Sequence, residues 1–361
     1  MKYIFFFVAV NLVVSFLVYI TIVSNFWASS TTLSAFNIFE QKSIDSELSV
    51  RNLTISHNEL TDNMTVQALS TTHPSTSVVT MLPTSGVHTE GEPLYVVALE
   101  ETLVGRLGNQ MFIYAAMLGI ARTQNRIPLI VDGTLLEKAF QLNHIGRVNT
   151  TGWKTMVHSK HGTFDPTFMN LPKINVILYG CFQSWKFFVH VEDEIRREFT
   201  FHPNIHEKTT RFYGSLRQNN TDTVFVGVHV RRSDFLSAVN VNSGYGVPQM
   251  SYFINAINYI RRVVSNNTMF LVASDDMEWC KGNFNDSDVK LLEPDSAENH
   301  LSILSRSDHV IISGGTYGWW AAWLTKGLKI YFNGFPSPGS KLIKNLKKAD
   351  YYPKGWIALD N

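Results

Sequence analysis

Residues 223–235, TVFVGVHVRRSDF, contain the pattern on which the fold prediction depends. The apolar run from 223 to 230 predicts a buried strand, and two arginines follow it directly. A helical pattern comes next, PQMSYFINAINYIRRVV at 248–264 with Pro248 expected in its first turn, and then a second strand, MFLVAS, at 269–274. Strand and helix continue to alternate as far as LKIYF at 328–332, which we expect to be the last strand. This alternation predicts a parallel, doubly wound α/β sheet.

A second α/β unit precedes this region. YVVAL at 95–99 predicts a strand, GRLGN at 105–109 a glycine turn, QMFIYAAMLGIAR at 110–122 a helix, and IPLIV at 127–131 a second strand. VILYGCFQSW at 176–185 predicts a strand and a loop, HVEDEIRREF at 190–199 a charged helix, and residues 153–172 show no clean period. We therefore predict two Rossmann-like domains, 93–215 and 216–361, with the split near residues 205–222 and a cleft between them. Ligands of such sheets bind at the carboxyl ends of the strands.

The beginning of the chain has a different composition. Residues 4–23, IFFFVAVNLVVSFLVYITIV, are long and apolar enough to span a bilayer as a signal anchor, with residues 1–3 as a cytoplasmic tail. The alternative is a cleaved signal peptide, whose apolar part is usually shorter. Residues 24–92 are rich in Ser, Thr and Asn and predict a flexible stem.

Glycosylation sequons occur along the extramembrane part, which fits a protein of the secretory pathway. They begin at Asn52, Asn63, Asn149, Asn219, Asn266 and Asn285.

Composition excludes several protein classes. The formal net charge of +1 gives no general attraction to nucleic acid, so any anion site must be local. With only Cys181 and Cys280, the chain is neither a disulfide-dense scaffold nor a Cys-rich zinc module, and the sequence leaves open whether the two pair.

The charged residues at the end of strand 223–230 favour an anionic ligand. His229, Arg231, Arg232 and Asp234 stand at or just beyond the end of this apolar run. Two arginines beside a core are costly unless an acceptor meets them, and guanidinium groups bind phosphate oxygens in pairs. A nucleotide diphosphate fits this pattern. The alternative is ion pairing with nearby carboxylates.

A second candidate lies in ISGGTYGWW, residues 312–320. Ser313 follows another apolar strand, and Thr316 stands where a helix starts, so free backbone N–H groups there can bind an anion. Thr316 is equally explained as an ordinary N-cap. The helix, expected to close at Gly327, carries three tryptophans that we interpret as core rather than as a sugar platform.

Two acidic residues, Asp275 and Asp276, follow strand 269–274. A carboxylate at this edge can accept the two donors that guanine presents; we assign that role to Asp276, and for Asp275 this role and a helix cap are equally open. The alternative is a helix N-cap at Ser274 or Asp275.

The turn GRLGNQMF, residues 105–112, opens a helix in the first domain. Arg106 and Asn109 are expected to close over phosphates from across the cleft, although the block lacks the spacing of the known phosphate loops. A glycine turn used only for packing is the alternative.

No metal ion is expected. Asp286 and Asp288 form a D-x-D spacing, but they precede a strand instead of following one, and we treat the spacing as coincidence. The 12 histidines include no helical pair at metal-binding spacing.

Taken together, GRLGNQMF, VGVHVRRSDF, SDDMEWC and SGGTYGWWAAWLTKG resemble the galactoside α-1,2-fucosyltransferases of glycosyltransferase family 11, the histo-blood-group H-type enzymes. The resemblance runs from about residue 94 to 357. H-x-R-R also occurs in α-1,6- and protein O-fucosyltransferases, whereas the first and last blocks indicate the α-1,2 group. Ser233 and Tyr317 depart from the Gly and Phe that members often carry, and some vertebrate members lack the acidic pair 275–276.

The resemblance implies a GT-B-like fold, with 93–215 as the acceptor-side domain and 216–361 as the GDP-fucose-binding domain. Together with the anchor, the stem and the sequons, it indicates a single-pass type II Golgi membrane protein with a lumenal catalytic part. It implies inverting, metal-free transfer of fucose from GDP-fucose to the 2-OH of a terminal galactose on glycoprotein or glycolipid glycans. It also implies a set of donor contacts: the β-phosphate at Arg231 supported by Arg232, the guanosine at His229 and Asp276, and the pyrophosphate near Ser313 and Thr316.

Two questions stay open at this stage. Asp234 is the nearest carboxylate by sequence to serve as general base, but it equally suits a role in orienting Arg231 or Arg232. The rival functions are a core α-1,6- or protein O-fucosyltransferase with the same donor site, and a membrane-anchored lectin without catalysis. The intact H-V-R-R argues against the lectin, which needs no diphosphate clamp.

Overall fold

The structure, a computed structural model, describes residues 93–98, 103, 105–217, 222–265 and 267–361. The expected tail 1–3, the membrane anchor 4–23 and the stem 24–92 lie outside these residues, as do Asn52, Asn63, Asn219 and Asn266. Within the described ranges, no helix combines the length and apolarity needed to cross a membrane.

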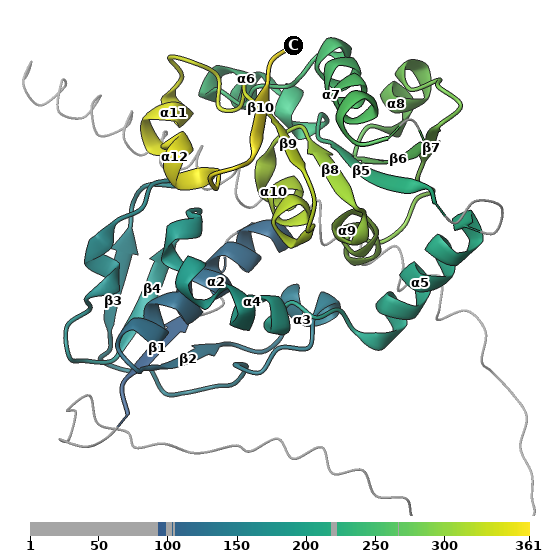
Figure 1. Cartoon of the computed structure of the whole chain (residues 1–361). Helices are drawn as coiled ribbons and strands as arrows, with labels where there is room; N and C mark the ends of the chain where they lie inside the picture. Colours follow the sequence, from purple (N-terminus) through teal and green to yellow (C-terminus); the bar gives the residue numbers. More distant parts are fainter. Residues whose placement is uncertain (1–92, 99–102, 104, 218–221, 266) are drawn as a thin grey trace, which may run out of the picture. The chain divides into compact units, whose positions relative to one another are not determined.

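The first half is built on a four-stranded parallel sheet with the order β2-β1-β4-β3 (Figure 1). Its strands are β1 (Tyr95–Ala98), β2 (Ile127–Ile130), β3 (Lys154–His158) and β4 (Val176–Gly180). Its main helix, α2 (Leu107–Thr123), is buried on nearly every side, since only Asn109 and the last two residues are not fully buried. The shorter helices are α3 (Leu136–Ala139), η2 (Pro166–Met169), η3 (Trp185–Phe187), η4 (Val189–Val191) and α4 (Glu192–Glu198).

The second half is a six-stranded parallel sheet with the order β10-β9-β8-β5-β6-β7. Its strands are β5 (Val224–Val230), β6 (Thr268–Ser274), β7 (Val289–Leu291), β8 (His309–Ile312), β9 (Lys329–Phe332) and β10 (Ile357–Leu359). Its helices are η5 (Asp234–Leu236), α6 (Ala238–Ser243), α7 (Met250–Val263), α8 (Met277–Asn283), α9 (Ala297–Arg306), α10 (Gly315–Leu324), α11 (Lys341–Asn345) and α12 (Lys348–Tyr351). The predicted parallel α/β architecture is confirmed.

The order of the strands reverses between β5 and β8. From β5 the chain adds β6 and β7 on one side, then crosses to add β8, β9 and β10 on the other. In open α/β sheets such a reversal leaves a crevice at the carboxyl ends of the two strands, where ligands bind. The arginine pair therefore follows the strand at the switch point of the sheet.

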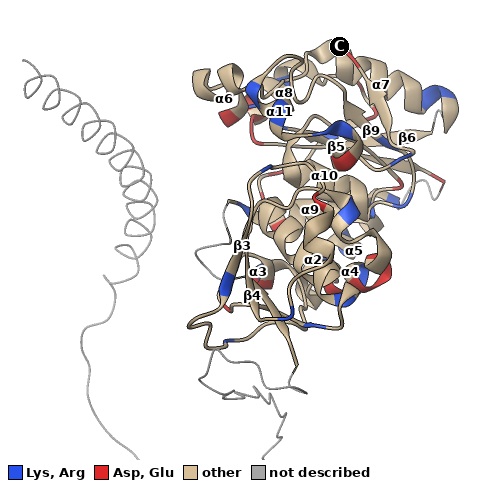
Figure 2. Cartoon of the chain, turned by 90° about the vertical axis from the view of Figure 1, so that its left-hand side faces the viewer, with Lys and Arg blue, Asp and Glu red and all other residues tan. Residues whose placement is uncertain are grey.

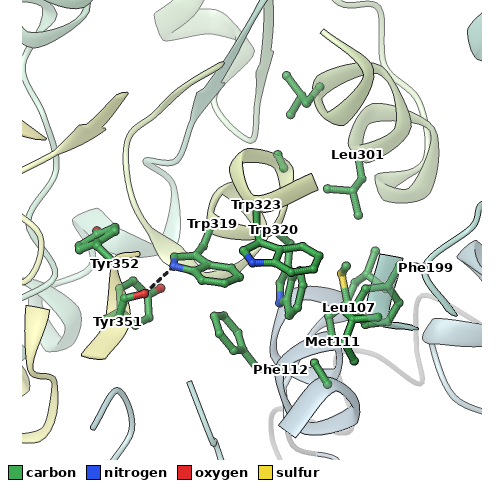
Figure 3. Close-up of a cluster of buried hydrophobic side chains, with 14 of the residues drawn as sticks. Leu107, Met111, Phe112, Phe199, Leu301, Trp319, Trp320, Trp323, Tyr351 and Tyr352 are labelled. Atoms are coloured by element: carbon green, nitrogen blue, oxygen red, sulfur yellow. Dashed lines mark hydrogen bonds between the residues drawn. The ribbon is translucent and has the colours of Figure 1, made fainter. Parts of the chain in front are cut away.

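A single hydrophobic core runs through both halves, and α2 packs directly on α10. Phe112 of α2 lies against Trp319 and Trp320 of α10, with ring centroids 4.4 and 5.1 Å apart (Figure 3). Trp319 and Trp320 are fully buried and Trp323 is 7% exposed. The interpretation of these three tryptophans as core is confirmed.

The last segment of the chain packs back onto the first half. Asp350 in α12 is the central contact, because its side chain pairs with Lys186 Nζ at 2.6 Å and accepts from the Phe164 amide at 3.1 Å. Its backbone oxygen accepts from Ser184 Oγ at 2.6 Å. Trp319 Nε1 donates to the Tyr351 carbonyl at 2.8 Å, which fixes the same segment to α10 (Figure 3).

Several predicted boundaries are wrong. Pro248 lies before α7, whose N-cap is Gln249. Helix α10 ends at Leu324 with Thr325 as its C-cap, not at Gly327; Gly327 instead lies so close to the Asp308 carbonyl that a Cβ would meet it at 2.0 Å. The strand 328–332 is followed by one more, β10.

Two elements fall where the sequence showed no clean pattern. β3 lies in the unassigned stretch 153–172, and helix α5 (Pro203–Arg217) lies largely in the expected split at 205–222. Helix α5 packs on α9, where Thr209 Oγ1 donates to Ser302 Oγ at 2.8 Å. Residues 203–215, assigned to the first domain from the sequence, thus contact the second half.

Candidate active site

The polar side chains singled out in the sequence meet at the carboxyl edge of the second sheet. β5 pairs with β6 on one side and with β8 on the other, all parallel. Arg231 follows β5, Asp275 follows β6 and Ser313 follows β8, so adjacent parallel strands deliver all three to one edge. The Ser313 hydroxyl accepts from the Arg231 amide at 2.7 Å, which ties the ends of β5 and β8 together.

Arg231 is held by carboxylates on both sides. Its Nη2 lies 2.5 Å from Asp234 Oδ2, and its Nη1 lies 2.9 Å from Asp275 Oδ2. The guanidinium also lies over the Phe235 ring at 5.5 Å, and its side chain is 19% exposed. Arg231 is therefore oriented along the edge of the sheet rather than into open solvent.

Arg232 has its own acidic and aromatic partners. Its Nε lies 3.3 Å from Asp276 Oδ2, and its guanidinium stacks over Trp279 at 4.0 Å. Its backbone amide donates to Asp275 Oδ1 at 2.9 Å. The ion pairs considered as the alternative to an anion site are thus present, and the two arginines form one cluster with Asp234, Asp275 and Asp276.

Asp276 is also the N-cap of α8, because its Oδ1 accepts from the Trp279 amide at 3.1 Å. The alternative that placed the cap at Ser274 or Asp275 is wrong by one or two residues. The role of Asp276 toward guanine stays a prediction. For Asp275 the sequence left guanine recognition and a helix cap equally open; it is not the cap, and it instead pairs with Arg231 and accepts from the Arg232 amide.

His229, the last but one residue of β5, is 6% exposed and its Nδ1 has no hydrogen-bond partner. Gly318 of α10 packs against this atom so closely that a Cβ would lie 2.4 Å from it. Burial and, secondarily, the nearby Arg231 charge lower the pKa of His229 to about 4. The imidazole is therefore neutral at pH 7 and adds no charge to the site.

The N-terminus of α10 meets the N-terminus of α2. The Thr316 hydroxyl donates to Asn109 Oδ1 at 2.8 Å, and Gln183 Nε2 donates to the same oxygen at 3.2 Å. The N-cap of α10 is Gly314, which makes no side-chain cap, so the prediction that Thr316 is an ordinary N-cap is wrong. Arg106 is the exposed N-cap of α2.

Glycine is required at this helix crossing. A Cβ on Gly108 would lie 2.6 Å from the Tyr317 amide nitrogen, closer than real Cβ contacts. Gly315, with φ of 78°, adopts a left-handed conformation at the start of α10. These residues bring Asn109 to Thr316 and leave the backbone N–H groups at the start of α10 without a side-chain cap.

An aromatic wall of Phe235, Tyr245 and Phe335 borders Arg231, whose guanidinium lies over the Phe235 ring. The Tyr245 ring lies 4.7 Å from Phe235 and 5.9 Å from Phe335. Burial raises the pKa of Tyr245, with smaller contributions from Cys181 and Asp234. Sequence reasoning missed this wall and Gln183. Gln183 lies just beyond the end of β4 and could have been found by that position, whereas the wall combines Phe235 of the short η5 with two loop residues, and none of these segments shows a period.

The remaining polar candidates lie elsewhere. Asp286 and Asp288 both pair with Arg261, at 2.9 and 2.7 Å, away from the carboxyl edge. Among the described residues, no three His, Cys, Asp or Glu side chains are grouped so as to hold a metal ion. Cys181 and Cys280 are both free, and burial raises the pKa of Cys280 to about 11. Figure 2 shows acidic and basic segments interspersed over the described part of the chain.

The known proteins to which this chain is similar belong to one class of enzyme. The model of glycosyl transferase family 11 matches residues 87–360. The chain is similar to galactoside alpha-(1,2)-fucosyltransferase 1 of Oryctolagus cuniculus, 31% identical over 271 residues that cover 71% of this chain and 72% of the relative. It is also similar to galactoside alpha-(1,2)-fucosyltransferase 2 of Bos taurus, 32% identical over 270 residues that cover 71% and 77%.

Solved structures give more distant matches. The alpha-1,6-fucosyltransferase NodZ soaked with GDP-fucose superposes with a TM-score of 0.44 at 15% identity, covering 65% of this chain and 93% of that chain. POFUT1 in complex with GDP superposes with a TM-score of 0.38 at 14% identity, covering 64% and 94%.

Proposed function

The chain belongs to glycosyl transferase family 11, and from this membership we propose that it transfers L-fucose from GDP-fucose to the 2-OH of a terminal galactose. The curated relatives that carry this activity in their names match it over most of their own length. The structural observation that carries the proposal is the arginine pair at the switch point of the second sheet. We further propose that the two sheets are the two halves of a GT-B enzyme, which the switch point of the second sheet supports.

Charge development in the reaction assigns the roles. When the bond between fucose C1 and the diphosphate breaks, its electron pair goes to a β-phosphate oxygen. Arg231, supported by Arg232, and the uncapped N–H groups at the start of α10 stabilise this charge. Because guanidinium groups supply the positive charge, we propose a transfer that needs no metal. The acceptor hydroxyl attacks from the opposite face of the sugar, so the anomeric configuration inverts.

The other site residues complete the proposed donor site. Ser313 positions the Arg231 amide, and Thr316, Asn109 and Arg106 lie at the meeting of α10 and α2 where they border the diphosphate. His229, neutral at pH 7, and Asp276 border the guanosine. Asp234 is the proposed base, since it is the carboxylate next to Arg231 on the side of the aromatic wall.

Substitution of Arg231 tests the proposal. Arg231→Lys should lower kcat/KM for transfer from GDP-fucose to a β-galactoside by about 100-fold or more, because a lysine cannot replace the bidentate contact of a guanidinium group. Arg261→Lys is the matched control, because Arg261 also pairs with two aspartates but lies away from the site. The kcat/KM of this variant should stay within about twofold of that of the unaltered chain. Activity of the unaltered chain on peptides or on core GlcNAc alone would contradict the proposed acceptor.

We also propose that the protein is a single-pass type II protein of the Golgi membrane, anchored by residues 4–23 with its catalytic part in the lumen. The apolar run and the sequons along the chain support this topology. The described sequons Asn149 and Asn285 are both exposed. In sealed Golgi vesicles, protease should cleave the catalytic part only after detergent is added. Cleavage without detergent would contradict the topology.

A further inference from the structure

The ionic cluster at the proposed donor site carries more negative than positive charge. Two guanidinium groups, Arg231 and Arg232, face the carboxylates of Asp234, Asp275 and Asp276, which gives a formal charge of −1. A diphosphate brings further negative charge to the same guanidinium groups. Since like charges at contact distance repel, binding requires at least one carboxylate to leave its arginine.

Two of the three carboxylates are fixed by additional bonds. Asp275 accepts from the Arg232 amide through Oδ1, pairs with Arg231 Nη1 through Oδ2, and accepts from Ser233 Oγ through its backbone oxygen at 2.7 Å. Asp276 caps α8 through Oδ1 while Oδ2 faces Arg232. Each of them uses both carboxylate oxygens in holding the backbone or an arginine in place.

Asp234 is held far less firmly. Its side chain makes one charged contact, from Oδ2 to Arg231 Nη2. Its Oδ1 is shielded from solvent and accepts no hydrogen bond, although 43% of the side chain as a whole is exposed. A carboxylate oxygen that is shielded from solvent and lacks a hydrogen-bond donor is energetically unfavourable. Displacing Asp234 from Arg231 therefore costs little free energy.

We propose that Asp234 competes with the donor diphosphate for Arg231: the donor displaces Asp234 from Nη2, while Asp275 remains on Nη1 and keeps the guanidinium oriented. This inference rests on the proposed function. It makes Asp275 a positioning residue, and it gives Asp234 two successive partners, first Arg231 and then the acceptor.

The displacement links donor binding to the chemical step. While Asp234 Oδ2 is paired to Arg231 Nη2, this oxygen is occupied and is not free to accept the proton of the acceptor hydroxyl. Once displaced, it takes the proton of the acceptor hydroxyl as the hydroxyl oxygen bonds to fucose C1. The bond from C1 to the diphosphate breaks in the same step, and its electron pair stays on the β-phosphate beside Arg231. The donor therefore binds before the base is available, which gives an ordered reaction.

Two isosteric substitutions on the same guanidinium test the inference in the full chain. Asp234→Asn should tighten GDP binding by about two- to fivefold, because the charged competitor is gone and a larger fraction of the sites is ready to bind. Its kcat should fall by about 100-fold or more, since the base is lost. Asp275→Asn should instead weaken GDP binding by about tenfold, because Arg231 loses its fixed partner.

Titration calorimetry with GDP and initial rates with GDP-fucose and a β-galactoside give the two readouts. Opposite shifts of the GDP dissociation constant in the two variants, with a lower donor KM for Asp234→Asn, support the competition. If both variants weaken GDP binding, Asp234 only orients Arg231 and the inference is overturned, while the proposed function stands. If the unaltered chain binds no GDP, the proposed function fails and the inference with it.

Discussion

At the scale of single residues, the site shows which assignments a sequence can support. The arginine pair was found because charged residues rarely follow a wholly apolar strand without a partner. Which carboxylate meets which arginine was not predictable, since Asp275 comes from β6, a strand whose register against β5 only the fold establishes. The cap at Asp276 was missed for a similar reason: its neighbours Ser274 and Asp275 are equally good capping residues.

Buried His229 gives a prediction about pH. Its folded-state pKa of about 4 lies below the ordinary value of about 6.5, so between these pH values the unfolded chain binds a proton that the folded chain does not. The contribution of neutral His229 to the free energy of unfolding is complete above about pH 6.5 and is lost as the pH falls toward 4. In His229→Gln, the fall in the free energy of unfolding over this window should be smaller by about 3 kcal/mol. Urea unfolding followed by tryptophan fluorescence at several pH values measures it, and an identical pH slope in both proteins would contradict the assignment.

At the scale of elements, a strand was predicted correctly where its buried residues form a continuous apolar run in the sequence. Elements without such a run were missed. β5 and β8 are nearly all buried and were found. β3 is an edge strand, four of whose five residues are not buried, and only its pairing with β4 makes it a strand. Helix α5 did carry a signal, since its buried residues Ile205, Thr209 and Tyr213 recur every four positions, but two of them are polar or amphipathic.

Two helical glycines provide a matched test of the contact between α2 and α10. Gly108→Ala should lower the free energy of unfolding by about 2 kcal/mol or more, because its methyl group collides with the backbone at Tyr317. Gly214→Ala, at an exposed position of α5, meets nothing within 4 Å and should raise the free energy of unfolding by about 0.5 kcal/mol through better helix propensity. Denaturant midpoints of the two variants measure both effects. Equal midpoints would show that α2 does not approach α10 as closely as described.

At the scale of the whole molecule, the two sheets share one hydrophobic core and are tied by the C-terminal segment. The sequence predicted two α/β halves from their separate strand–helix patterns. It gave no sign that α12 returns to the first half, because that contact rests on Asp350 and Tyr351, two residues of a four-residue helix too short to show a period. Long-range contacts of this kind have no local period to reveal them.

Asp350→Asn tests the tie between the halves. The change leaves Lys186, one-third of whose side chain is exposed, without its buried charged partner, and should cost about 2 kcal/mol of stability. Asp132→Asn removes the partner of Arg147 in an exposed pair and should cost less than about 1 kcal/mol. Thermal unfolding of both variants compares the two losses. A loss no larger at Asp350 than at Asp132 would show that the C-terminal segment does not hold the halves together.

The packing of Phe112 on Trp319, Trp320 and Tyr351 has a consequence for biosynthesis. A ribosome releases α2 long before it makes the aromatic residues that cover it; Asn109 and its partner Thr316 are 207 positions apart. Until these aromatic residues emerge, α2 exposes an apolar surface that is prone to aggregation and is a natural target for chaperones. Premature termination after β4 but before α10 would therefore leave α2 without its cover, even though every strand of the first sheet had already been synthesised.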